Sequence, residues 1–428
     1  MNLPGEHPAM NGASFDADTL AQLEHIGQAD IIVGIPSFNN ARTIGHVVRA
    51  IQAGLAKYFP GHRAVIVNSD GGSADGTMDV VKNTSIDDFS AILLHHSVEP
   101  TAKIVFPYSG IPGKGSAFRT IFAIAGMMDA KACAVVDSDL RSITPEWIEL
   151  LVKPVLAGGY DYVAPLYHRH KFDGTITNSI VYPLTRALYG KRVRQPIGGD
   201  FGFSGNLAQF YLTKDVWQSD VARFGIDIWM TTTAIANGFK VTQSFLGAKI
   251  HDAKDPGSDL SNMLYQVVSA TFDLMETYAG VWMPIRATEP VAVFGFEYTV
   301  GLEQVNVNTA RMLHIFREGL RSLGEIWRDI LGAGDFNEVA RLGVLADDEF
   351  HFPIGLWTRV VYDYALAFHN RKMPVEHLIK SMTPLYVGKT ASFILQVWDM
   401  GQQEAEAEIE KLCMEFENSK DYLVSGWK

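Results

Sequence analysis

The chain has few cysteines, no long apolar run and no excess of basic residues. Its 428 residues include only two cysteines, Cys133 and Cys413, which are too few for a disulfide framework. No apolar stretch approaches the roughly 20 residues that span a bilayer. The N-terminus also lacks the basic and apolar regions of a secretory signal. We therefore expect reduced thiols and a soluble, cytoplasmic protein without stable membrane insertion.

The charge balance excludes one more class of protein. A formal net charge of -12 leaves no basic stripe of the kind that binds nucleic acid, so we expect no nucleic-acid partner. A small anionic ligand stays compatible with this charge, because a few lysine and arginine side chains can dominate one pocket. The length exceeds the usual size of a single hydrophobic core and indicates two domains.

Short apolar runs alternate with amphipathic segments up to about residue 165. This alternation predicts β-α units on a mostly parallel sheet, whose ligands gather at the carboxyl ends of the strands. We expect a tail and short helix over 1–28, a sheet domain over 29–256 and a helical region over 257–428. The predicted strands are 31–35, 64–67, 91–94, 132–136, 162–164 and 240–250. The predicted helices are 18–28, 43–58, 76–82, 116–128, 145–156, 262–278, 304–331, 357–368 and 402–416.

The most informative motif is Asp137-Ser138-Asp139, which directly follows an apolar run. Asp137 and Asp139 alternate at a strand end, so both carboxylates can face the same cleft. They repel each other unless a cation joins them, and hard oxygen ligands suit Mg²⁺ or Mn²⁺. The alternative interpretation is structural, with Asp139 or Ser142 capping the helix that follows.

Two earlier motifs precede predicted helices, and the one that begins at Asn68 also follows a predicted strand. In Gly113-Lys114-Gly115 the glycines permit close backbone approach, the helix N-terminus favours anions, and Lys114 adds a positive charge for phosphate. A solvent-exposed turn is the alternative. The run from Asn68 to Thr77 offers hydroxyl and carboxylate groups to a nucleobase or ribose, although its composition suits any strand-to-helix turn.

Further candidates lie later in the chain. His251 ends a predicted strand and completes a metal site only if the fold brings it to the carboxylates. The basic segments 168–171 and 191–194 could hold an anionic acceptor, with solvated loops as the alternative. The glycine-rich turn 198–202 and the helix start at Asp227 each supply one carboxylate, and either carboxylate could be a cap.

The order of these motifs resembles the GT-A glycosyltransferases of the family-2-like group. The run PGKG…VVDSDL…IGGDFGFS…GIDI…KIHD looks most like the retaining glucosyl-3-phosphoglycerate synthases and the glucosylglycerate and mannosylglycerate synthases. The resemblance covers about residues 30–255. It implies a Rossmann-like GT-A domain followed by a C-terminal helical region. It also implies a metal-dependent hexosyltransferase that moves glucose or mannose, with retention, from a UDP- or GDP-hexose to a small anionic hydroxy acid such as glycerate or 3-phosphoglycerate.

The resemblance further implies roles for individual residues. The nucleotide-sugar side would comprise Pro36, Ser37, Asn39, Ser69, Lys114, Asp137 and Ser138. The acceptor side would comprise Gly198, Gly199, Asp200, Arg192 and Arg194. Mg or Mn would be held by Asp139 and His251, and catalysis would involve Asp137, Asp139, Lys114 and Asp227. Asn39 stands where the family often has an acidic residue, and Asp227 where it more often has glutamate. A homodimer is also expected.

Three other classes stay open. A family-2 transferase acting on a lipid or polysaccharide acceptor would carry membrane helices or a Gln-x-x-Arg-Trp motif, and the sequence has neither. A sugar-phosphate nucleotidyltransferase would place its glycine-rich loop directly after the first strand, where this chain has Pro36-Ser37-Phe38. A non-catalytic nucleotide-sugar-binding protein would bind the donor without turning it over.

Overall fold

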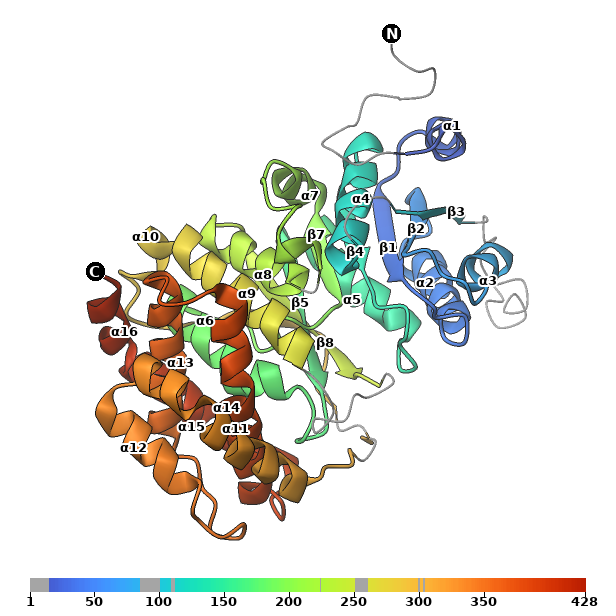
Figure 1. Cartoon of the computed structure of the whole chain (residues 1–428). Helices are drawn as coiled ribbons and strands as arrows, with labels where there is room; N and C mark the ends of the chain where they lie inside the picture. The colour runs from blue at the N-terminus through green and yellow to red at the C-terminus, as the bar shows by residue number, and fades with distance from the viewer. Residues whose placement is uncertain are drawn as a thin grey trace. The chain divides into compact units, whose positions relative to one another are not determined.

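The computed structural model describes residues 15–84, 101–108, 112–223, 225–250, 261–298, 301–302 and 305–428 (Figure 1). The chain divides into two compact units. The first comprises residues 1–168, 197–252 and 291–301, and the second comprises 169–196, 253–290 and 302–428. This division differs from the boundary expected near residue 256. Residues 169–196 belong to the second unit although they precede residue 256, and residues 291–301 belong to the first although they follow it.

The described part of the first unit is built on an eight-stranded sheet. Its strands are β1 (Ile31–Ser37), β2 (Ala64–Asp70), β3 (Ala102–Pro107), β4 (Ala132–Val135), β5 (Tyr162–His168), β7 (Phe201–Ser204), β8 (Val241–Ala248) and β10 (Val293–Phe294). They lie in the order β10-β8-β5-β7-β4-β1-β2-β3. Neighbours are parallel, except that β7 runs antiparallel to β4 and β5. The predicted α/β class with a mostly parallel sheet is confirmed.

Helices flank this sheet. They are α1 (Ala17–Ile26), α2 (Ile44–Tyr58), α3 (Thr77–Asn83), α4 (Lys114–Met127), α5 (Pro145–Leu156), α7 (Gly205–Leu212), the short 3-10 helix η3 (Asp220–Ala222) and α8 (Ile226–Ala236). Every residue of β1 is buried, as expected for a central parallel strand covered on both faces. Ile31, Val33 and Ile35 of β1 share a core with α2 and α5. On the other face α4 packs closely, because a Cβ added at Gly34 would lie 2.6 Å from the Ile121 side chain.

Two parts of the sheet differ from the sequence prediction. β2 continues to Asp70, so the polar residues Asn68, Ser69 and Asp70 belong to the strand rather than to the loop after it. The strand predicted over 91–94 lies outside the described residues, and β3, which the sequence did not predict, pairs with β2. β3 is an edge strand in which only Ile104 and Phe106 are buried, so its apolar pattern is weak.

The second unit is predominantly helical where it is described, which confirms the predicted helical C-terminal region. It contains η2 (Thr177–Val181), α6 (Tyr182–Tyr189), α9 (Ser261–Thr277), α10 (Ala279–Trp282), α11 (Thr309–Ile330), α12 (Ala333–Leu342), α13 (Ile354–His369), α14 (Val375–Gln396), α15 (Gln402–Asn418), α16 (Lys420–Trp427) and the short strands β6 (Lys191–Arg192) and β9 (Glu289–Pro290). The sequence missed α14, which is buried around most of its circumference and so lacks an amphipathic pattern. No helix in the described ranges has both the length and the apolar character needed to cross a membrane.

A buried charge anchors segment 169–196 in the second unit. The side chain of Arg186 in α6 is only 1% exposed. Its Nη1 and Nη2 donate to the carboxylate of Glu410 at 2.5 and 2.8 Å, and its Nε donates to Glu417 at 2.5 Å. Because both glutamates lie more than 200 residues further along the chain, local patterns could not predict this pairing.

Replacing Gly202 by alanine should destabilise the sheet unit. A Cβ on this residue of β7 would lie 2.0 Å from the carbonyl oxygen of Leu151 in α5, so strand and helix would have to separate. Overpacking of this kind costs about 1–3 kcal/mol, which equilibrium urea unfolding measures. Gly61→Ala is the control, because nothing lies within 4 Å of a Cβ at Gly61, and its change should stay below about 0.5 kcal/mol. Equal stability of the two variants would contradict the close packing.

Candidate functional site

The sheet topology brings several polar segments to one edge. The parallel strands β1, β2, β4 and β8 all end at this edge, and the antiparallel strand β7 begins there. The turn formed by residues 198–200, just before β7, therefore lies beside the segment that follows β4. Lys249, immediately after β8, reaches the same place. In open α/β sheets this edge is where ligands bind.

Lys249 links two carboxylates in this cluster. Its Nζ donates to Oδ2 of Asp137 and to Oδ2 of Asp200, both at 2.7 Å, and to the carbonyl oxygen of Gly198 at 2.8 Å. Asp200 is fully buried. Its Oδ1 accepts the backbone N–H of Asp137 at 2.8 Å, and its Oδ2 also accepts the hydroxyl of Tyr167. These contacts fix the direction in which the Asp137 side chain points.

Lys114 approaches Asp137 from the opposite side. Its Nζ lies 2.8 Å from Oδ1 of Asp137, 3.3 Å from Oδ2 of Asp227 and 3.4 Å from the carbonyl oxygen of Gly199. Both oxygens of Asp137 therefore contact ammonium groups. Oδ1 of Asp227 is buried and has no hydrogen-bond partner among the described residues. The cluster thus retains one buried acceptor that a ligand hydroxyl can use.

Burial and neighbouring charge oppose each other in this cluster. Burial raises the pKa of Asp137, but Lys114 and Lys249 outweigh it and hold the pKa well below its usual range. Burial raises the pKa of Asp227, and Lys114 only partly offsets this rise. Burial lowers the pKa of Lys114, yet Asp137 and Asp227 bring it above its usual range. At neutral pH Asp137 and Lys114 are therefore charged. Asp227 is protonated more easily than Asp137, because its pKa is raised and that of Asp137 is lowered.

The turn before β7 requires glycine at one position. Gly199 has a φ of +90°, in the left-handed region that favours glycine. A Cβ added there would lie 2.3 Å from Oδ2 of Asp137 and 3.1 Å from Nζ of Lys249. The structure thus brings together Gly198, Gly199 and Asp200, predicted on the acceptor side, with Lys114, Asp137 and Asp227, predicted as catalytic. Asp200 and Asp227 bind the cluster rather than cap a helix.

The residues predicted at the nucleoside lie at the ends of β1 and β2. Pro36 is the register partner of Ser69. The hydroxyl of Ser37 donates to Oδ2 of Asp70 at 2.6 Å and accepts from Nδ2 of Asn68 at 2.9 Å. Ser69 is fully buried and Ser37 nearly so. In this conformation both hydroxyls lie inside the protein, and the Ser37 hydroxyl helps to hold the two strand ends together.

Asn39 and Ser138 lie in two loops that are connected by a side-chain hydrogen bond. Asn39 is exposed, with a φ of +54°, and its Oδ1 accepts the N–H of Ala74 at 3.0 Å. The hydroxyl of Ser138 donates to Oδ1 of Asn40 at 2.8 Å. Asn40, which the sequence did not single out, therefore connects the loop after β1 to the carboxylate motif after β4.

Gly113-Lys114-Gly115 is not the solvent-exposed turn that the sequence allowed, because the Lys114 side chain is only 14% exposed. A Cβ on Gly115 would lie 1.9 Å from the carbonyl oxygen of Val221, so this glycine allows α4 to pack against η3. The N–H of Gly115 donates to the carbonyl oxygen of Arg223 at 3.1 Å, and that of Gly113 is also bonded within the protein. Because these two N–H groups are already bonded, the Lys114 ammonium is the group of this motif that best fits the expected anion.

Asp139 follows β4 and is partly exposed. The interpretation that Asp139 or Ser142 is the N-cap of the next helix is wrong, because the N-cap of α5 is Thr144. Ser142 instead accepts the N–H of Ile250 at 2.9 Å. Within the described ranges, no three His, Cys, Asp or Glu side chains are grouped to hold a metal ion. His251, the second predicted metal ligand, lies outside the described residues.

Arg192 and Arg194 belong to the second unit. Nε and Nη2 of Arg194 donate to the carboxylate of Glu406 at 3.1 and 3.0 Å. Nε of Arg192 donates to the hydroxyl of Thr288 at 3.1 Å. Both guanidinium groups thus have partners within their own unit, and their predicted contact with an acceptor stays a prediction.

Lys249 and Tyr167 are the functional-site residues that the sequence analysis missed. Each lies at the end of a strand, β8 or β5, whose carboxyl end is at the polar edge. A lysine directly after an apolar strand was the available signal for Lys249. It gave no hint of a partner, because Asp137 lies 112 residues earlier in the chain.

A scan against protein-family models and a search of curated proteins find no match to this chain. Similar solved structures include glucosyl-3-phosphoglycerate synthase from Mycobacterium tuberculosis. The complex with Mg²⁺ and uridine diphosphate shows 19% identity and a TM-score of 0.43, covering 64% of this chain and 85% of that chain. The complex with Mn²⁺, UDP-glucose and phosphoglyceric acid shows 19% identity and a TM-score of 0.43, covering 68% and 96%. Values this low identify neither the substrate nor the reaction of this chain.

Lys249→Met should destabilise the protein strongly, because it leaves the fully buried Asp200 and the largely buried Asp137 without their shared cation. Breaking a buried ion pair on one side costs about 3–5 kcal/mol. Urea unfolding at pH 7 measures this loss. Lys240→Met is the matched control, since Lys240 is exposed just before β8 and should cost less than about 0.5 kcal/mol. A Lys249→Met protein as stable as this control would show that the cluster does not depend on the lysine.

Proposed function

We propose that this chain is a nucleotide-sugar-dependent hexosyltransferase that acts on a small anionic hydroxy acid. The observation that carries the proposal is the cluster of Lys114, Asp137 and Asp227 at the carboxyl edge of the sheet, with one buried Asp227 oxygen left without a partner. Carboxylates held in fixed directions suit the hydroxyl groups of a sugar, and a neighbouring ammonium group suits a diphosphate. The order of the sequence motifs supports the same function.

Different residues of the cluster would contact different parts of the donor. Oδ1 of Asp227 would accept a hydrogen bond from a hydroxyl of the donor sugar, and Asp137 would contact the same region. Lys114 would place its positive charge beside the diphosphate, where negative charge accumulates as the glycosidic bond breaks. Pro36, Asn39 and the loop around them would lie on the nucleoside side.

The proposal includes a divalent cation. Mg²⁺ is commonly held by one or two carboxylates together with substrate phosphates, and Asp139 would supply such a carboxylate. Ile250, which precedes His251, exchanges backbone and side-chain hydrogen bonds with Arg141 and Ser142. Both follow Asp139 closely in the chain, which supports pairing His251 with Asp139 at one Mg or Mn. When bound, the cation neutralises charge on the leaving diphosphate.

The proposed reaction retains the configuration at the anomeric carbon. The bond from this carbon to the diphosphate oxygen breaks, a hydroxyl oxygen of the acceptor bonds on the same face, and the proton of that hydroxyl passes to the leaving diphosphate. Asp137 is a poor nucleophile, because both of its oxygens contact ammonium groups and its pKa lies well below its usual range. The backbone at Gly198 and Gly199 would receive the acceptor carboxylate.

A donor-by-acceptor screen tests this function. UDP-glucose, GDP-glucose and GDP-mannose are each incubated with glycerate or 3-phosphoglycerate, with Mg²⁺, with Mn²⁺ and with a chelator. We expect a glycosylated acid to form with at least one pair, and only with a metal. Donor hydrolysis without any glycosylated acid would overturn the choice of acceptor while keeping the transferase class. Donor binding without any turnover would indicate the non-catalytic alternative.

Asp227→Asn should weaken turnover by removing charge where the donor sugar is held. A hydrogen bond to a charged group contributes about 1.5–3 kcal/mol, so kcat/KM for the donor should fall roughly 10- to 150-fold. Initial rates at varied donor concentration measure the change, and urea unfolding checks that the protein stays folded. Asp79→Asn, at an exposed position in α3, is the control. If both variants kept the wild-type kcat/KM, Asp227 would not contact the donor.

A further inference from the structure

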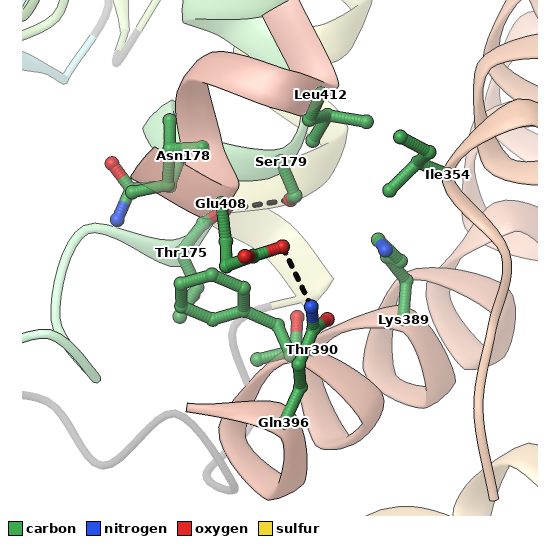
Figure 2. Close-up of a pocket in the computed structure, with 11 residues that line it drawn as sticks. Thr175, Asn178, Ser179, Ile354, Lys389, Thr390, Gln396, Glu408 and Leu412 are labelled. Atoms are coloured by element: carbon green, nitrogen blue, oxygen red, sulfur yellow. Dashed lines mark hydrogen bonds between the residues drawn. The ribbon is translucent and has the colours of Figure 1, made fainter. Parts of the chain in front are cut away.

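The second unit contains a pocket between α13, α14, α15 and the region of η2 (Figure 2). Its apolar wall consists of Ile354, Phe393, Ile409 and Leu412. The opposite wall includes residues of η2, which is a π-helical turn. Such turns are rare and often occur at functional sites. A lining that is mainly apolar with a few polar groups is typical of a small-molecule site.

Several polar side chains around the pocket already have partners inside the protein. The hydroxyls of Thr175 and Tyr386 bond each other at 2.5 Å. Nε2 of Gln396 donates to Oε2 of Glu408 at 2.7 Å, as Figure 2 shows, and Lys411 donates to Oε1 at 2.5 Å. The Glu408 charge is therefore compensated without any ligand.

Lys389 is different. It is only 3% exposed and lines the pocket. Its Nζ donates to the carbonyl oxygen of Phe352 at 3.2 Å, and no carboxylate of the described residues lies within 4.0 Å of it. A buried ammonium group without a counter-ion is costly. Burial lowers the pKa of Lys389 to about 8, with Glu408 opposing the shift, so the side chain is still mainly charged at pH 7.

We propose that this pocket binds a small organic monoanion, in which a carboxylate pairs with Lys389 and an apolar body packs against Ile354, Phe393 and Leu412. A single ammonium group matches a single negative charge. The pocket lies wholly within the second unit and uses no residue of the sheet-edge cluster, so the proposal is independent of the transferase function.

Calorimetric titration of the full chain with octanoate and with 1-octanol tests the charge requirement. At pH 7 we expect one octanoate to bind per chain, at least tenfold more tightly than 1-octanol. Lys389→Met should remove this tenfold preference. Lys380→Met, on the same helix but outside the pocket, should preserve it. Equal affinity for the two compounds, or unchanged octanoate binding by Lys389→Met, would overturn the proposal.

The pH dependence gives a second readout. The titratable groups that interact with Lys389 are Glu408 from α15 and His351 from the loop before α13. Burial lowers the pKa of His351, so this imidazole stays neutral between pH 7 and pH 9. The pKa of Lys389 is about 8, so this side chain loses its proton over that range. Octanoate should therefore bind about tenfold more weakly at pH 9 than at pH 7. Equal affinity at both pH values would contradict the ion pair.

A variant that fills the pocket keeps the test decisive if Lys389→Met does not fold. Leu412→Trp adds bulk to the apolar wall and leaves Lys389 in place. It should abolish the binding of octanoate, while its thermal unfolding reports whether the helices remain packed. A folded Leu412→Trp protein that binds octanoate with wild-type affinity would show that the ligand lies elsewhere.

Discussion

The ammonium group of Lys249 holds the polar edge of the sheet together. Asp137 and Asp200 lie close enough for their charges to repel, and both would be costly to bury alone. Lys249 contacts both at 2.7 Å and also binds the carbonyl oxygen of Gly198. Gly198 precedes β7 and Asp137 follows β4. The Lys249 ammonium group therefore connects the antiparallel strand β7 to the neighbouring strand β4. The position of Lys114 beside Asp137 depends on this arrangement, since it contacts the one Asp137 oxygen that Lys249 leaves free.

The two carboxylates of the Asp137-Ser138-Asp139 motif have different surroundings. Both oxygens of Asp137 contact lysine ammonium groups, so this carboxylate is unsuited to bind a cation strongly. Asp139 is partly exposed at the end of the same segment and is not the N-cap of α5. In the proposed function, Asp137 would contact the donor sugar and Asp139 the metal. The short spacing of the motif would then bring these two roles to neighbouring residues.

Three buried cations of the second unit show how differently one fold can accommodate charge. Arg186 pairs with two glutamates. Lys420 donates to four carbonyl oxygens, at 2.8 to 3.2 Å, from the chain around α6 and α10. Lys389 has a single carbonyl partner and faces a pocket. The first two have complete polar surroundings and serve the packing of the helices. The third lacks them, which is why a ligand is the natural source of its missing negative charge.

The sequence by itself determined many of the local elements and proposed the candidate residues. Strands such as β1 and β4 and the helix starting at Pro145 follow from patterns between chain neighbours. Lys114, Asp137 and Gly199 received their expected roles from a resemblance in the order of motifs. Only the tertiary structure decided which groups meet. Asp137 bonds Asp200 63 residues later and Lys249 112 residues later, and residues 169–196 join helices from the end of the chain. Such pairings depend on the order and direction of strands and on buried charge, whereas periodicity records only whether a residue faces the core or the solvent.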